Sequence, residues 1–114
     1  MNCLDPETIA SLKALDDGDG FFAEIVSTFL GNARPTLSQL ASAQAANDLP
    51  ALERLAHKLR GAASTVGAQR LMALCSRLET AARQGTVVDA AADVETIETE
   101  FQRVVAALEV ELQA

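Results

Sequence analysis

The residues best suited to do chemistry in this chain of 114 residues lie around its one histidine, His57. Lys58 follows directly, and Arg60, Gly61 and Ser64 lie three, four and seven positions further on. In a helix these spacings put the last three on the same face as the imidazole. An imidazole can act as nucleophile, proton carrier or metal ligand, so its surroundings must decide between these roles.

The helix expected around His57 has a clear apolar side. Apolar residues recur at helical spacing on that side: Leu52, Leu55, Ala56, Leu59, Ala62, Ala63 and Val66. At about 100° per residue, His57 points almost directly away from this stripe. It is therefore expected to face solvent, as an ordinary surface histidine or as a functional one.

Cations gather around the imidazole although the chain carries a net charge of −7. Arg54, Lys58 and Arg60 have a plain interpretation as solubilising charges, but together they could neutralise a phosphoryl group on the ring nitrogen. Gly61 is unusual because a glycine inside a helix costs roughly 1 kcal/mol relative to alanine. Either the glycine is simply tolerated, or it allows close contact between two helices, or it leaves a flat surface that another protein approaches.

Several other chemistries lack the residues that they need. A metal site requires several converging ligands, whereas there is no second histidine and Cys3 and Cys75 form no recognisable framework. The chain has no Gly-x-Ser-x-Gly elbow and no glycine-rich loop that would cradle phosphates, so it is expected to be unable to use ATP. No cofactor is expected to reside in this chain.

Charge and hydropathy limit the partners and the compartment. The acidic balance, with a pI near 4.5, argues against nucleic acid and against an anionic membrane surface as main partners. No signal peptide is evident at the N-terminus, and no apolar run approaches the ~20 residues that span a bilayer. Cys75 lies in an apolar helical stripe and is expected to behave as a small hydrophobe. A cytoplasmic location is expected.

The elements that must position His57 are predicted to be helical throughout. A short helix should begin with Asp5 as N-cap and Pro6 at its first position. Four longer helical segments follow, approximately at residues 22–41, 50–66, 71–82 and 94–112. Pro35 should kink the first of these, and Gly67 and Gly85 should mark helix ends. The acidic residues of the last segment, Glu100 among them, are expected to face mostly away from its apolar side. The prediction is an all-α antiparallel up-down four-helix bundle, a single domain over residues 1–114, with the short first helix covering one end.

The sequence from Ala56 to Ala68 closely resembles the signature of the histidine-containing phosphotransfer (HPt) family. The signature reads His-x-Leu-Lys-Gly with a second glycine downstream, which Gly67 matches. The resemblance continues into the following helix at Leu71, Leu74-Cys75 and Leu78-Glu79, and into the preceding one at Phe29 and Pro35, so that it covers most of the chain.

This resemblance implies a phosphorelay carrier. His57 would take a phosphoryl group on Nε2 from the aspartate of a receiver domain and pass it to another receiver, whose own acidic site supplies Mg²⁺. Lys58 and Arg60 would assist electrostatically. Gly61 would permit docking, and the neighbouring Ser64 and Arg54 are assigned to the same partner surface.

The chain departs from the family pattern at two positions. Arg60 replaces the usual lysine, which keeps the charge but exchanges a point charge for a planar fork. Glu79 stands where some relatives have a glutamine that hydrogen-bonds the other ring nitrogen, Nδ1. Either Glu79 orients the ring in the same way, or it is a solvated charge at the edge of its helix.

Three alternatives compete with a phosphorelay carrier. The hairpin of sensor kinases also presents a histidine, but it usually has an acidic residue where Lys58 stands and needs a dimer to complete four helices. The main alternative is a receiver-binding module that carries no phosphate, and a helical metal or hydrolase domain is a distant third. The carrier is expected to be a monomer, either free-standing or part of a hybrid sensor kinase.

Overall fold

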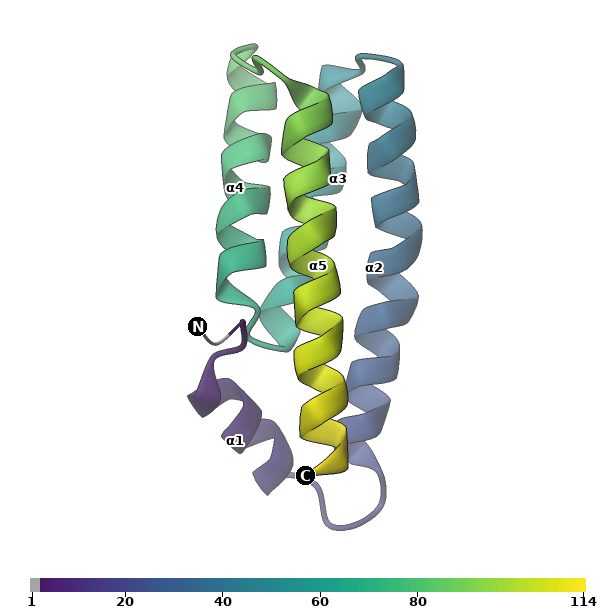
Figure 1. The fold of residues 1–114 in the computed structure, drawn as a ribbon, viewed down its shortest axis with the longest axis vertical. Helices are drawn as coiled ribbons and strands as arrows, with labels where there is room; N and C mark the ends of the chain where they lie inside the picture. The colour runs from purple at the N-terminus through teal and green to yellow at the C-terminus, as the bar shows by residue number, and fades with distance from the viewer. Residues whose placement is uncertain (1–2) are drawn as a thin grey trace.

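The computed structural model describes residues 3–114, and all regular secondary structure in this range is helical. The five helices are α1 (Pro6–Ala14), α2 (Phe21–Ala45), α3 (Leu49–Thr65), α4 (Gln69–Gln84) and α5 (Ala90–Gln113). Helices α2 to α5 run alternately up and down, and α1 lies across the end where α2 begins and α5 finishes (Figure 1). The predicted antiparallel bundle with a short additional N-terminal helix is confirmed.

Each long helix packs against two other long helices. Helix α3 contacts α2 and α4, and α5 contacts the same two helices from the other side, so α3 and α5 are diagonal partners (Figure 1). The core between them is made largely of leucine, alanine and valine, and it includes the rings of Phe29 and Phe101, whose centroids are 5.8 Å apart. Small side chains let the helices approach closely.

Helix α2 continues through Pro35, so the prediction that this proline does not end the helix is confirmed. A proline inside a helix removes one backbone donor and crowds the preceding turn. The helix persists because its inner side is buried on both sides of Pro35, at Ala33 and at Leu37 and Leu40.

Side chains cap two of the helices that frame the bundle. The carboxylate of Asp48 accepts from the Ala51 amide at 3.1 Å at the start of α3, and Asp89 likewise caps α5. Asp5 occupies the predicted N-cap position of α1, but its carboxylate accepts from the Thr8 hydroxyl at 2.7 Å and makes no cap bond to the backbone.

Gly67 marks the end of α3, as predicted, and lies in the turn between α3 and α4, where α1 packs against it. Its φ of +68° is a left-handed conformation that favours glycine, and its carbonyl accepts from the Asp5 amide at 2.8 Å. A Cβ added at Gly67 would lie 2.8 Å from Cβ of Thr8. The turn between α3 and α4 therefore needs a glycine for its conformation and also for the close approach of α1.

The expectation that the acidic residues of α5 face outward is wrong for Glu100. Only 2% of this residue is exposed, and its Oε1 lies 3.4 Å from Nε of Arg70 on α4. Glu100 lies three positions after Ile97 and four before Val104, so it shares their apolar face, and Arg70 at the edge of that face gives it a partner.

None of the helices in the described part of the chain is long and apolar enough for a membrane span.

Candidate functional site

His57 lies in the middle of α3 on the side that faces away from the core. Its side chain is 63% exposed, whereas the neighbouring Ala56 and Leu59 are fully buried. The apolar stripe predicted for this helix is buried at Leu52, Leu55, Ala56, Leu59, Ala63 and Val66. The stripe fixes the rotation of α3, so the imidazole projects from a rigid element into solvent.

A buried carboxylate from α4 holds one nitrogen of the imidazole. Oε2 of Glu79 lies 2.9 Å from Nδ1 of His57, and the Glu79 side chain is only 9% exposed. Among residues 3–114, nothing is hydrogen-bonded to Nε2. A neutral imidazole that donates from Nδ1 carries its lone pair on Nε2. In the tautomer that donates to Glu79, the lone pair of Nε2 is therefore free.

Two further residues fix the position of the Glu79 carboxylate. Arg83, one turn along α4, donates to Oε2 of Glu79 at 3.0 Å and to Oε2 of Glu53 on α3 at 2.9 Å. The hydrogen bond to Glu53 raises the pKa of Arg83 above its usual value. Sequence reasoning missed both residues. The spacing of four between Glu79 and Arg83 was an available signal, but nothing local pointed to Glu53.

Arg60 turns its guanidinium toward the same ring nitrogen. Its Nη2 lies 2.9 Å from Nδ1 of His57 and 3.5 Å from Oε1 of Glu79, and its Nη1 donates to Oγ of Ser76 at 3.4 Å. The cation therefore lies beside the Nδ1 edge of the imidazole.

Gly61 and Ser64 flank a shallow depression beside the imidazole, with a volume of about 230 Å³, that Met72 of α4 also lines. Apart from its chain neighbours and the backbone of α3, no described atom lies within 4 Å of a Cβ added at Gly61, so no contact with another described helix requires a glycine here. The Ser64 hydroxyl donates to the Gly61 carbonyl at 2.6 Å. The surface next to His57 is thus open and low.

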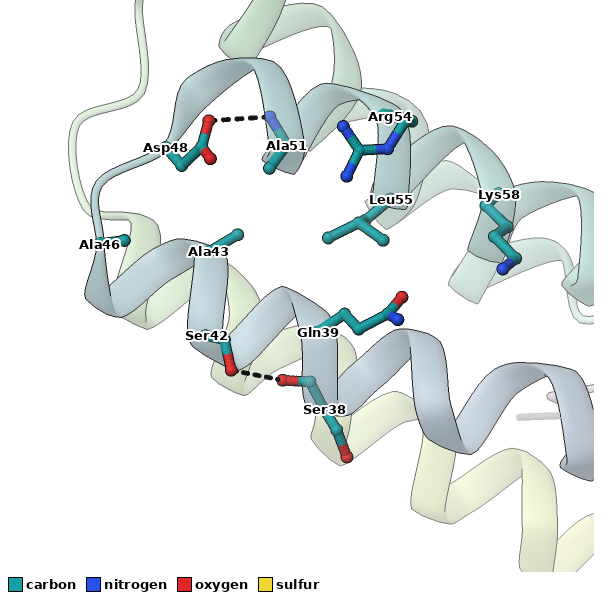
Figure 2. A pocket seen from close by; sticks show the side chains of 10 residues that line it. All are labelled: Ser38, Gln39, Ser42, Ala43, Ala46, Asp48, Ala51, Arg54, Leu55 and Lys58. Carbon is teal, nitrogen blue, oxygen red and sulfur yellow. Dashed lines mark hydrogen bonds between the residues drawn. The ribbon is translucent and has the colours of Figure 1, made fainter.

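Arg54 and Lys58 lie on a different part of the surface from Arg60. They line a groove of about 720 Å³ between α2 and α3, opposite Ser38, Gln39 and Ser42 (Figure 2). The apolar part of the groove comes from Ala43, Ala51 and Leu55. The structure therefore divides the predicted cation cluster, with Arg60 beside the imidazole and the other two along the adjoining groove.

The charges of the bundle are separated by helix. Together α3 and α4 contain six lysine and arginine residues against two acidic ones, whereas α5 contains six acidic residues and one arginine. The hairpin that bears His57 is therefore positive in a chain whose net charge is −7. Such a surface favours approach by an acidic partner surface.

Possible metal ligands and cysteine thiols are further groups of this chain that can react. In the described part of the chain, no three histidine, cysteine or acidic residues are grouped so that they could hold a metal ion. Cys75 is fully buried among apolar residues, as predicted, and burial raises the pKa of its thiol to about 12. A thiol in that state is a packing group.

Comparison with known proteins matches residues 24–107 to the Hpt domain model. The chain is 32% identical over 84 residues to the phosphorelay protein LuxU of Vibrio cholerae, a match that covers 74% of each sequence. It also resembles the crystal structure of histidine-containing phosphotransfer protein B from Pseudomonas aeruginosa, with a TM-score of 0.87 and 33% identity over 97% of this chain and 95% of the other. The fold is shared with the maize protein ZmHP2, at 23% identity, a TM-score of 0.86 and coverage of 98% of this chain and 84% of that one.

Proposed function

We propose, since the chain belongs to the Hpt domain family, that His57 is the residue on which it carries phosphate. The chain is a phosphorelay carrier of two-component signalling. The observation that supports His57 is the exposed imidazole whose Nδ1 lies 2.9 Å from Glu79 while Nε2 has no hydrogen-bond partner among residues 3–114.

This geometry supports the following transfer step. The Nε2 lone pair attacks the phosphorus of a receiver's aspartyl phosphate, the bond between phosphorus and the aspartate oxygen breaks, and the aspartate leaves as a carboxylate. The ring keeps its proton on Nδ1 and becomes positively charged. Glu79 stabilises that charge because its carboxylate accepts the Nδ1 hydrogen at 2.9 Å. The reverse sequence delivers the phosphoryl group to the next receiver.

The surroundings of the imidazole fit a protein partner that brings its own catalytic groups. Gly61, Ser64 and the groove bordered by Arg54 and Lys58 form the proposed docking surface, and their open, positive character suits the acidic site of a receiver. Lys58 and Arg60 favour the approach of the phosphoryl oxygens through their charge. Mg²⁺ is assigned to the receiver's site.

We further infer that the carrier works as a monomer in the cytoplasm and has no kinase activity of its own. The bundle is complete within one chain, since α2 to α5 enclose a common core. The sequence contains no phosphate-cradling loop that would bind ATP.

The experiment is transfer from a phosphorylated receiver. Receiver domains labelled with radioactive acetyl phosphate, incubated with the chain and Mg²⁺, should transfer an acid-labile, base-stable label. Because His57 is the only histidine, such a label reports on this residue alone. The variant His57→Gln should remain folded and unlabelled, and persistent labelling of that variant would refute the assignment.

The same experiment tests the alternative function. A receiver-binding module without phosphate chemistry would bind the receiver and leave it phosphorylated. Co-elution of chain and receiver without any label on the chain would therefore favour the module over the carrier.

A further inference from the structure

Two groups with opposite hydrogen-bonding character lie at the same distance from Nδ1 of His57. Glu79 Oε2 and Arg60 Nη2 are each 2.9 Å away. An ionised carboxylate only accepts hydrogen bonds and a guanidinium only donates them, whereas a single ring nitrogen either donates or accepts. Nδ1 therefore bonds to Glu79 when it carries a hydrogen, and to Arg60 when it does not.

Each group keeps other partners when the ring bonds to its competitor. Arg60 has Oε1 of Glu79 at 3.5 Å and Oγ of Ser76 at 3.4 Å, and Glu79 keeps the hydrogen bond from Arg83 at 3.0 Å. Neither change leaves a buried charge without a partner, which would be costly. Both states of the ring are thus available without a rearrangement of α3 or α4.

The two states correspond to different stages of phosphate transfer. Before transfer, Nδ1 carries a hydrogen and the Nε2 lone pair is free. Once the bond between Nε2 and phosphorus has formed, the ring is a cation until the Nδ1 hydrogen is lost to water, and the neutral phosphorylated ring then has a lone pair on Nδ1. The phosphoryl group departs more readily from the protonated ring, because the leaving group is then a neutral imidazole and not an anion.

We propose that Arg60 and Glu79 are competing positioning residues: Glu79 holds the ring that accepts and releases phosphate, and Arg60 holds the neutral ring that stores it. This inference rests on the proposed function of His57 and adds a chain-specific control of how long the phosphate stays. The charged groups that face Nδ1 are Arg60 from α3, and Glu79 with Arg83 behind it from α4.

The test measures the lifetime of the phosphohistidine without any partner. The chain is phosphorylated with potassium phosphoramidate, whose P–N bond breaks with release of ammonia as Nε2 attacks, and the decay of the label is followed after removal of the reagent. Arg60→Met should shorten the lifetime and Glu79→Met should lengthen it, each by about threefold to tenfold, the factor expected for one typical hydrogen bond. Arg77→Met is the matched control, because it removes a cation from an exposed position of α4 that has no contact with the ring.

The two signs separate this role from a structural one, since a loss of packing would move both lifetimes in the same direction. Nitrogen NMR of the wild-type ring gives a second test: Nδ1 should carry a hydrogen before phosphorylation and should lack one in the phosphorylated chain at mildly basic pH. Unchanged lifetimes in both variants, or changes of the same sign, overturn the proposal and leave His57 as the carrier. A wild-type chain that phosphoramidate and phosphorylated receivers both fail to label overturns the proposed function as well.

Discussion

Substitution of Gly61 by alanine should stabilise the fold and weaken docking of the receiver domain. The residue is in the interior of α3, and no described atom beyond its chain neighbours and the α3 backbone lies within 4 Å of the Cβ that alanine would add. Gly61→Ala therefore gains the helix propensity of alanine without a clash, about 1 kcal/mol in the free energy of unfolding. For a chain of this size, that gain raises the melting temperature by about 4 °C.

The same substitution should slow phosphotransfer, because the added methyl group stands on the surface next to His57 where the receiver docks. Gly61→Glu adds both bulk and a negative charge that repels the acidic receiver site, and transfer should fall by about tenfold or more. The assay pairs thermal unfolding by circular dichroism with the rate of label transfer from a phosphorylated receiver.

Ala106→Glu is the control for the added charge. Ala106 is an exposed position on α5, which lies diagonally opposite α3, so this variant should transfer at the wild-type rate. A Gly61→Glu variant that transfers as fast as Ala106→Glu would refute the docking role of the glycine. A lower melting temperature for Gly61→Ala would show that the fold itself needs glycine at this position.

Two further predictions concern the fold around the site. Gly67→Ala should destabilise the protein by about 2–4 kcal/mol, because the backbone there is left-handed and the added Cβ would lie 2.8 Å from Thr8. Gly85→Ala is the comparison: its φ is +70° but the space around it is open, so the substitution should cost only about 1–2 kcal/mol. Equal losses of stability in urea unfolding would show that the contact between Gly67 and α1 does not matter. Cys75 should resist iodoacetamide in the folded protein while the partly exposed Cys3 reacts, since burial raises the pKa of Cys75 to about 12, and peptide mapping by mass spectrometry distinguishes the two. Because that folded-state pKa lies above the usual value of 9.0, the stability contributed by the neutral thiol is present below about pH 9 and is lost as the pH rises toward 12.

Residues near one another in the sequence determined which segments are helical and which face of each is buried. Helical spacing of apolar residues and Gly67 and Gly85 as terminators are local signals, and the described structure agrees with them closely. The outward direction of His57 is also local, because 3.6 residues per turn place it opposite the apolar stripe of its own helix. The expectation that the acidic residues of α5 face mostly outward failed at Glu100, which helical spacing places on the same buried face as Ile97 and Val104.

Only the tertiary structure decided what surrounds the imidazole. Glu79 meets Nδ1 across 22 positions of sequence and Arg83 reaches Glu53 across 30, and these contacts depend on how α4 is rotated and shifted along α3. No periodicity within one helix determines that relative placement, because it results from the packing of two faces against each other. The direction of Arg60 is decided in the same way: its long side chain has several rotamers, and the positions of Glu79 and Ser76 on the neighbouring helix select the one that brings its charge to Nδ1.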